Sequence, residues 1–133
     1  MRKLHIAWIA GSLCASTASA EPPLTRHTLS AAERAAVLAG VKEGLVEPFG
    51  ATVDGLSAGW RMSKAGNRVV TVCGYVRALS RAGSFTGRVP FIGLIGTATR
   101  AGGPAFVVLN YGTSDTQRQV VVKVCREDGL LAD

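Results

Sequence analysis

The sequence contains few of the side chains from which catalytic and metal sites are most often built. It has two histidines, three cysteines and an aromatic content of only 6%. No glycine-rich stretch carries the lysine and hydroxyl pair of a phosphate-binding loop or the triple glycine of a dinucleotide-binding fold. No serine is expected at a strand-to-helix nucleophile elbow, and a Ser–His–Asp set would have to depend on His27 alone. These features predict neither an enzyme nor a bound cofactor.

Long hydrophobic runs are also missing. The apolar run Ile6 to Ala18 is about a dozen residues long, whereas a membrane-spanning helix needs roughly 20. It follows Arg2 and Lys3 and leads into Ala18-Ser19-Ala20, the small-x-small pattern of a cleavage site. We therefore predict a signal peptide over residues 1–20, cleaved before Glu21. The mature protein would be periplasmic or secreted, with no transmembrane segment; an uncleaved N-terminal anchor is the alternative.

Acidic residues are fewer than basic ones. Cleavage of the signal peptide would leave 13 Lys and Arg against 9 Asp and Glu, so the formal net charge would fall from +6 to +4. A basic exported domain is suited to an acidic protein surface or to an anionic envelope component such as a glycan or lipid head group. We expect no nucleic-acid partner.

Two cysteines, Cys73 and Cys125, would remain after cleavage, because Cys14 lies in the signal peptide. Exported compartments are oxidising, so a Cys73–Cys125 disulfide is the favoured prediction. Such a bridge would stabilise the fold by roughly 4 kcal/mol in the chain-entropy treatment. Two buried free thiols are the alternative. A metal site is not expected, since two cysteines and one distant histidine do not supply the four ligands that zinc prefers.

The rest of the chain predicts one α+β domain over residues 30–133, preceded by an extended arm over residues 21–29. Ser30 and Glu33 form a capping-box pattern before an alanine-rich helix that reaches about Val46. Apolar, β-prone runs predict an antiparallel sheet of about four strands at residues 52–62, 68–78, 89–99 and 105–111. Ser114 and Gln117 form a second capping box. The segment after it favours a helix, although its four valines also fit a strand. The expected architecture is two-layered.

Several single residues carry further expectations. Gly40 and Gly44 share a helix face on which a sheet could approach closely. Gly74, beside Cys73, indicates a close approach by the element that carries Cys125. His27 is expected to be solvated in the extended arm, and Gly55 and Gly59 are expected at β-bulges.

The connection between the second and third expected strands has the strongest binding character. It combines arginines with an aromatic and two hydroxyl side chains, and loops of this length are often functional. The candidate recognition residues are Arg77, Arg81, Ser84, Phe85, Thr86 and Arg88. The alternative is that Phe85 packs in the core and the arginines only keep the domain soluble.

The chain resembles a family of small exported proteobacterial proteins in three short motifs. These motifs are V-C-G-x-V at Val72–Val76, G-x-[FY]-T-G at Gly83–Gly87 and P-F at Pro90–Gly93. Members also have an N-terminal helix and a second cysteine shortly before a glycine, like Cys125 and Gly129. The chain departs from the family at residues 77–81, where asparagine and lysine are usual. The resemblance implies an exported α+β domain and no particular activity.

Taken together, these features favour an exported, non-enzymatic binding or inhibitor-like module. A structural envelope-associated protein that binds an anionic glycan or lipid is the alternative. An enzyme of unspecified class is the third possibility, and it would have to use His27.

Overall fold

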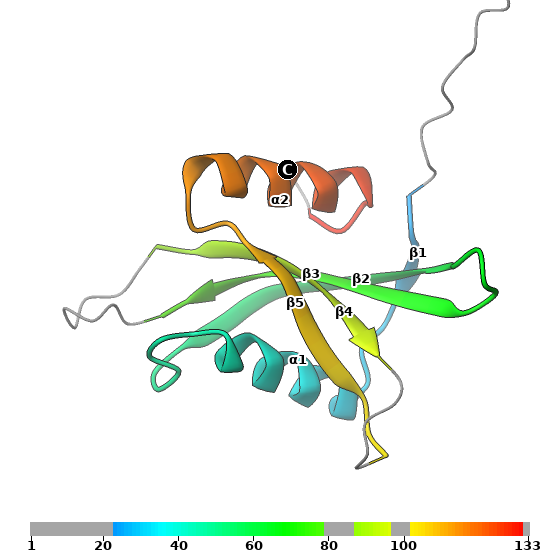
Figure 1. Ribbon diagram of the computed structural model, residues 1–133, viewed down its shortest axis with the longest axis horizontal. Helices are drawn as coiled ribbons and strands as arrows, with labels where there is room; N and C mark the ends of the chain where they lie inside the picture. The colour runs from blue at the N-terminus through cyan, green and yellow to red at the C-terminus, as the bar shows by residue number, and fades with distance from the viewer. Residues whose placement is uncertain (1–22, 79–86, 97–101, 132–133) are drawn as a thin grey trace, which may run out of the picture.

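The computed structural model describes residues 23–78, 87–96 and 102–131 (Figure 1). They form an antiparallel sheet with one helix on each face, an α+β fold with the expected N-terminal and C-terminal helices. In chain order the elements are β1 (Thr25–His27), α1 (Ala31–Glu43), β2 (Thr52–Met62), β3 (Arg68–Arg77), β4 (Val89–Gly96), β5 (Ala105–Tyr111) and α2 (Asp115–Glu127). The strands lie in the order β1-β2-β3-β4-β5, and each pairs with its sequence neighbours.

The described sheet has five strands rather than about four. The additional strand, β1, comes from the predicted arm and pairs antiparallel with β2, with Thr25 opposite Trp60 and His27 opposite Ala58. Three residues are too few to show a strand period in a sequence, and their extended state depends on pairing with a distant segment.

The two helices cover opposite faces of the sheet, so the layers number three where two were expected (Figure 1). Alternation along β3 explains the arrangement, because successive side chains of a strand point to opposite faces. Val72 joins the core cluster that contains Val37 and Val41 of α1, whereas Cys73 joins the cluster that contains Val121 and Cys125 of α2.

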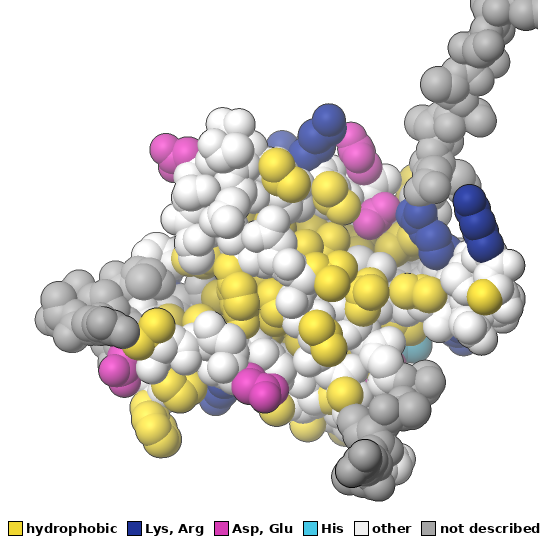
Figure 2. Space-filling model, viewed as in Figure 1, with side chains coloured by type: hydrophobic (Ala, Val, Ile, Leu, Met, Phe, Trp, Pro, Cys, Tyr) yellow, Lys and Arg dark blue, Asp and Glu magenta, His cyan; other side chains and the backbone are white. Residues whose placement is uncertain are grey.

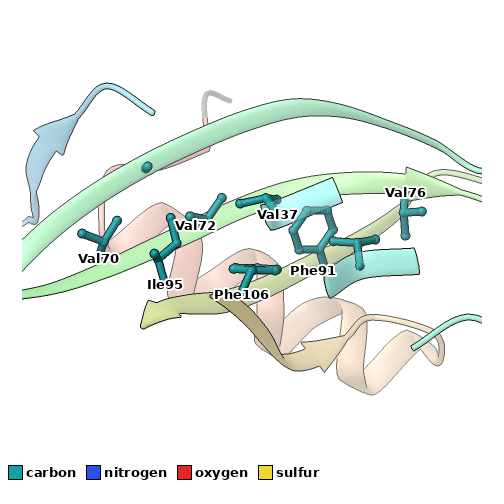
Figure 3. Close-up of a cluster of buried hydrophobic side chains, with 9 residues drawn as sticks. Val37, Val70, Val72, Val76, Phe91, Ile95 and Phe106 are labelled. Carbon is teal, nitrogen blue, oxygen red and sulfur yellow. The ribbon is translucent and has the colours of Figure 1, made fainter. Parts of the chain in front are cut away.

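The larger core lies between α1 and the sheet (Figure 3). Its buried members are Val37, Val41, Ala58, Val70, Val72, Val76, Phe91, Ile95 and Phe106. The Phe91 and Phe106 rings meet edge to face, with their centroids 6.1 Å apart. This is a favoured geometry for an aromatic pair.

The predicted capping boxes are confirmed at both helices. The Ser30 hydroxyl accepts from the backbone N–H of Glu33, and the Glu33 carboxylate accepts from the backbone N–H of Ser30. Ser114 and Gln117 make the equivalent pair of contacts at α2, which is a helix and not a strand. Helix α1 ends at Glu43, with Gly44 as its C-cap, so it is one turn shorter than expected.

The glycines of α1 allow the close approach to the sheet that the sequence indicated. A Cβ atom at Gly40 would collide with the backbone carbonyl oxygen of Phe106, and one at Gly44 would collide with the Tyr111 ring. The Tyr111 hydroxyl donates to the carbonyl oxygen of Val41 at 2.7 Å, which ties β5 to α1.

The predicted disulfide is confirmed: Cys73 of β3 and Cys125 of α2 are bonded. The expectation for Gly74 is wrong. A Cβ atom there would meet Leu56 and Phe91 on the α1 side, and not α2. The reason is the same alternation, since Cys73 already points to α2 and its neighbour must therefore point away.

Strand β2 contains the expected irregularity. Its register against β3 shifts between Asp54 and Ser57, and Gly55 has a φ of +62°, which only glycine adopts readily. The same expectation for Gly59 is wrong, because Gly59 lies in the regular ladder opposite Thr71. The shift matters for the site, because it bends the end of β2 that β1 leaves uncovered.

Helices of the described ranges are all too short or too polar to cross a lipid bilayer. The predicted signal peptide lies outside the described residues.

Candidate binding cleft

The described surface has a cleft of about 530 Å³ at the uncovered end of β2. Its volume falls within the range of about 300–1,000 Å³ that is usual for ligand sites. The lining comes from five separate parts of the chain: Arg26, Gly55, Leu56, Ser57, Tyr75, Arg88, Gly129, Leu130 and Leu131.

Strand pairing places the polar lining on the α2 side of the sheet. Ser57 is the cross-strand partner of Cys73, and Arg26 is the partner of Gly59, whose position faces Leu130. Cross-strand partners lie on one face. The cleft can form because β1 ends at His27 while β2 continues, and because the chain turns sharply after α2 at Gly129, where φ is +74°.

Arg88 is held in a defined orientation at the cleft. Its guanidinium lies 4.2 Å from the centroid of the Tyr75 ring and forms an ion pair with Asp54 at 2.5 Å. Its backbone carbonyl accepts a hydrogen bond from the Arg118 guanidinium at 2.7 Å. About half of the Arg88 side chain is nevertheless exposed. Arginine donates from a planar fork, so donors not used by Asp54 can face a ligand.

Arg26 adds a second positive charge to the lining. It is exposed and forms no ion pair with any residue in the described ranges. A smaller hollow of about 190 Å³ adjoins the cleft and shares Arg26, Leu56 and Ser57 with it, and it is also lined by Arg34. Asp54 neutralises the positive charge of Arg88 but not that of Arg26. The cleft and hollow together therefore favour the binding of an anionic group.

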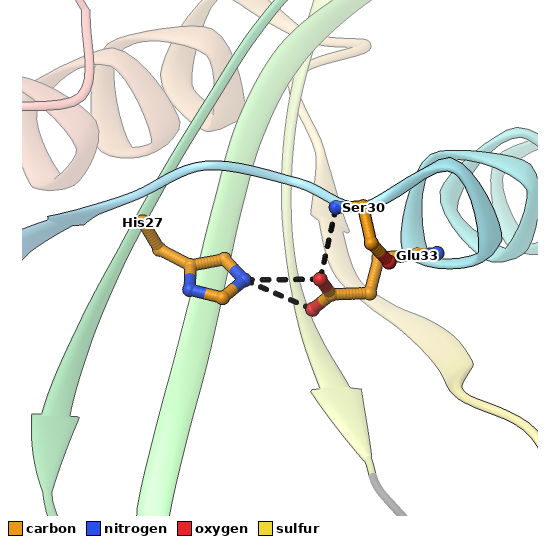
Figure 4. A network of polar contacts seen from close by, with 3 residues as sticks. All are labelled: His27, Ser30 and Glu33. Atoms are coloured by element: carbon orange, nitrogen blue, oxygen red, sulfur yellow. Dashed lines mark hydrogen bonds and ion pairs between the residues drawn. The ribbon is translucent and has the colours of Figure 1, made fainter.

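His27 is not the solvated residue that the sequence suggested. Its side chain is 18% exposed, and Nε2 donates to the two carboxylate oxygens of Glu33 at 3.0 and 3.2 Å (Figure 4). The pKa of Glu33 is lowered, chiefly by the backbone N–H of Ser30; partial burial opposes this and the His27 bond reinforces it. Since the same carboxylate caps α1, His27 joins β1 to the start of that helix.

The segment Gly55-Leu56-Ser57-Ala58-Gly59 has the G-x-S-x-G spacing of a serine hydrolase, a match that invites a test for catalysis. It lies inside β2 rather than at a strand-to-helix elbow. Ser57 pairs with Cys73 and faces α2, whereas His27 pairs with Ala58 and faces α1. The two side chains therefore project from opposite faces, and this geometry does not form a nucleophile–base pair.

The structure places two of the six predicted recognition residues. Arg88 lines the cleft, and Arg77 is exposed at the end of β3. The other four, Arg81, Ser84, Phe85 and Thr86, lie outside the described residues.

Sequence reasoning missed Arg26, Leu56 and Leu130 as lining residues. They are distant in the chain and meet only through β1–β2 pairing and the turn after α2. The sequence offered one usable signal, the expected β-bulge at Gly55. In the structure this glycine has a positive φ and marks where β2 bends.

Within residues 23–78, 87–96 and 102–131, no group of three or more histidine, cysteine and acidic side chains could hold a metal ion. Comparison of the chain with models of protein families, with curated proteins and with solved structures finds no match.

Proposed function

We propose that this protein is an exported, non-enzymatic binding module that recognises an acidic protein surface through the cleft at the end of β2. The observation that carries the proposal is the combination of Arg26 and Arg88 with an apolar floor. The floor consists of Leu130 and Leu131 beside the Tyr75 ring.

This lining suits a protein partner. Arginine and tyrosine are enriched among the residues that dominate protein–protein affinity. A guanidinium can bind a carboxylate through two parallel hydrogen bonds, and an adjacent apolar floor can receive the stem of the same side chain. Because Tyr75 and Asp54 already orient Arg88, part of the entropic cost of ordering that side chain is met before binding.

The surrounding scaffold is rigid enough for recognition. The Cys73–Cys125 disulfide fixes α2 to the central strand, and the cleft residues Leu130 and Leu131 follow α2 directly. Sites supported by strands and helices hold their geometry better than sites on free loops.

The experiment is a calorimetric titration of the mature domain with a short peptide that alternates glutamate and leucine. Arg26→Ala and Arg88→Ala should each weaken binding by roughly tenfold or more, since a hydrogen bond to a charged group contributes about 1.5–3 kcal/mol. Arg68→Ala is the matched control, because Arg68 also lies 4.2 Å from an aromatic centroid, that of Trp60, but lines neither hollow.

Two results would reject the proposal. One is equal loss of affinity in the Arg68 and Arg88 variants, which would mean that the peptide responds only to net charge. The other is preferential binding of an acidic oligosaccharide in the same assay, which would favour an anionic envelope polymer as the partner.

A further inference from the structure

The smaller hollow beside the cleft lies at the rim of the sheet, where β1 has ended and the chain turns into α1. Its volume is about 190 Å³, and its polar lining consists of Arg26, His27, Thr28, Arg34 and Ser57. Register places Arg26 and Ser57 on the α2 side of the sheet, whereas Arg34 belongs to α1 on the opposite face (Figure 1). Polar side chains from both faces therefore line this hollow.

Two guanidinium groups give the hollow an excess of positive charge. Arg26 and Arg34 are exposed, and neither pairs with an acidic side chain in the described part of the chain. Figure 2 shows Lys and Arg side chains in dark blue beside β1 on the viewed face.

The neighbouring carboxylates are engaged elsewhere. Glu33 accepts from His27 and from the Ser30 backbone, and Asp54 pairs with Arg88 in the cleft (Figure 4). Neither of these carboxylates lines the hollow. An anion that enters the hollow would therefore meet two guanidiniums and no lining acid.

Two hydroxyl groups add uncharged donors to the lining. Over residues 23–78, 87–96 and 102–131, the side chains of Thr28 and Ser57 make no hydrogen bond. A hydroxyl can rotate to donate to whatever acceptor is nearby. His27 lines the hollow as well, but its Nε2 already donates to Glu33.

We propose that the hollow binds a phosphate group, held by Arg26 and Arg34 together with the Thr28 and Ser57 hydroxyls. A tetrahedral phosphate presents acceptor oxygens in several directions, so it suits donors that come from both faces of the sheet. A planar carboxylate matches one guanidinium fork best. Two guanidiniums also balance the charge of nearly −2 that a phosphate monoester carries at neutral pH.

The phosphate site is separate from the cleft, although the two share Arg26. Arg34 and Thr28 line only the hollow, whereas Arg88 and Tyr75 line only the cleft. A phosphate in the hollow does not require a partner in the cleft, and variants at Arg34 and Arg88 distinguish the two sites.

Titration of the purified protein with inorganic phosphate, followed by calorimetry in a phosphate-free buffer, tests the inference. Arg34→Ala should weaken phosphate binding roughly tenfold or more, because a charge-assisted hydrogen bond is lost. Arg88→Ala should leave phosphate binding nearly unchanged. Arg68→Ala is the control, since it removes an equal charge from a position that lines neither hollow.

Thermal denaturation shows that the variants are folded and gives a second readout. Phosphate should raise the melting temperature of the wild type and of Arg68→Ala, because a ligand stabilises the state that binds it. It should raise that of Arg34→Ala much less. Thr28→Val removes only the hydroxyl donor of an exposed residue, so it should weaken phosphate binding severalfold.

Glycerol phosphate distinguishes the two sources of the phosphate group. Tighter binding of this ester would identify a site for the phosphate of a larger molecule, such as a lipid head group, and tighter binding of inorganic phosphate would identify a site for the free ion; either result supports the inference. A wild type that does not bind phosphate would overturn it, as would equal weakening in the Arg34 and Arg68 variants. Acetate binding as tight as phosphate binding would also overturn it.

Discussion

Arg88 and Arg68 both lie over aromatic rings in the described part of the chain, and their surroundings differ. Arg88 lies over Tyr75 at the cleft and also contacts Asp54. Arg68 lies over Trp60, away from both hollows, with its ring partner packed against the main core. The contact between guanidinium and ring is the same in each case, so our proposal that Arg88 binds a partner rests on the neighbouring cleft.

The Glu33 carboxylate makes stability depend on pH. Its pKa is lowered in the folded state, so the stability contributed by its ionised form is complete above the ordinary value of 4.5 and is lost as pH falls through the lowered value. We predict that Glu33→Gln is less stable than the wild type at neutral pH and that the difference narrows in acid.

Urea unfolding at neutral pH and at a pH below the lowered pKa measures this difference. Glu127→Gln is the control, since Glu127 is exposed on α2 and pairs with Lys123 only at 3.8 Å. Exposed pairs of this kind contribute little, so the control should change stability only slightly at either pH. If Glu33→Gln lost the same free energy of unfolding at both pH values, the charge of the carboxylate would not be the source of its stabilising effect.

At the scale of elements, the glycines of α1 let this helix approach β5 closely, and the sequence already indicated such an approach to the sheet. We predict that Gly40→Ala destabilises the protein by about 1–3 kcal/mol, because the new methyl group would collide with the Phe106 carbonyl. The better helix propensity of alanine, about 1 kcal/mol, offsets only part of this cost.

Thermal and urea denaturation would measure the change, with Gly96→Ala as the matched substitution. A Cβ atom at Gly96 meets no atom within 4 Å, so this variant should keep nearly the wild-type stability. A Gly40 variant at least as stable as the wild type would mean that α1 can move away from β5 without penalty.

The elements were predictable from the sequence where a local signal defines them. Ser30 and Ser114 predict helices because each forms a capping box with the residue three positions later. The β-branched run of β3 predicts a strand. What depended on distant partners was not predictable: strand β1 exists through pairing with β2, and the face of Gly74 depended on which side α2 occupies. The cleft belongs to the second kind, because Arg26, Tyr75 and Leu130 meet only in the folded chain.

For the whole molecule, the cleft and the contact between α1 and β5 lie toward opposite edges of the sheet. The cleft lies at the β1–β2 end of the sheet, whereas α1 packs closely against β5 at the other end, where Gly40 faces the Phe106 carbonyl. The family resemblance and the export of the domain stay predictions. If the domain is exported, it would meet its partner in the periplasm or outside the cell.

The most direct measurement of the central claim is an NMR titration of the isotopically labelled mature domain with the glutamate–leucine peptide. The account predicts that backbone amide shifts concentrate at residues 55–57 and at Tyr75 and Leu130, which line the cleft. The same peptide should cause little change in the Arg88→Ala variant, and rising salt should weaken the effect. Shifts confined to surfaces outside the cleft, or equal shifts in wild type and variant, would contradict the assignment of the cleft as the recognition site.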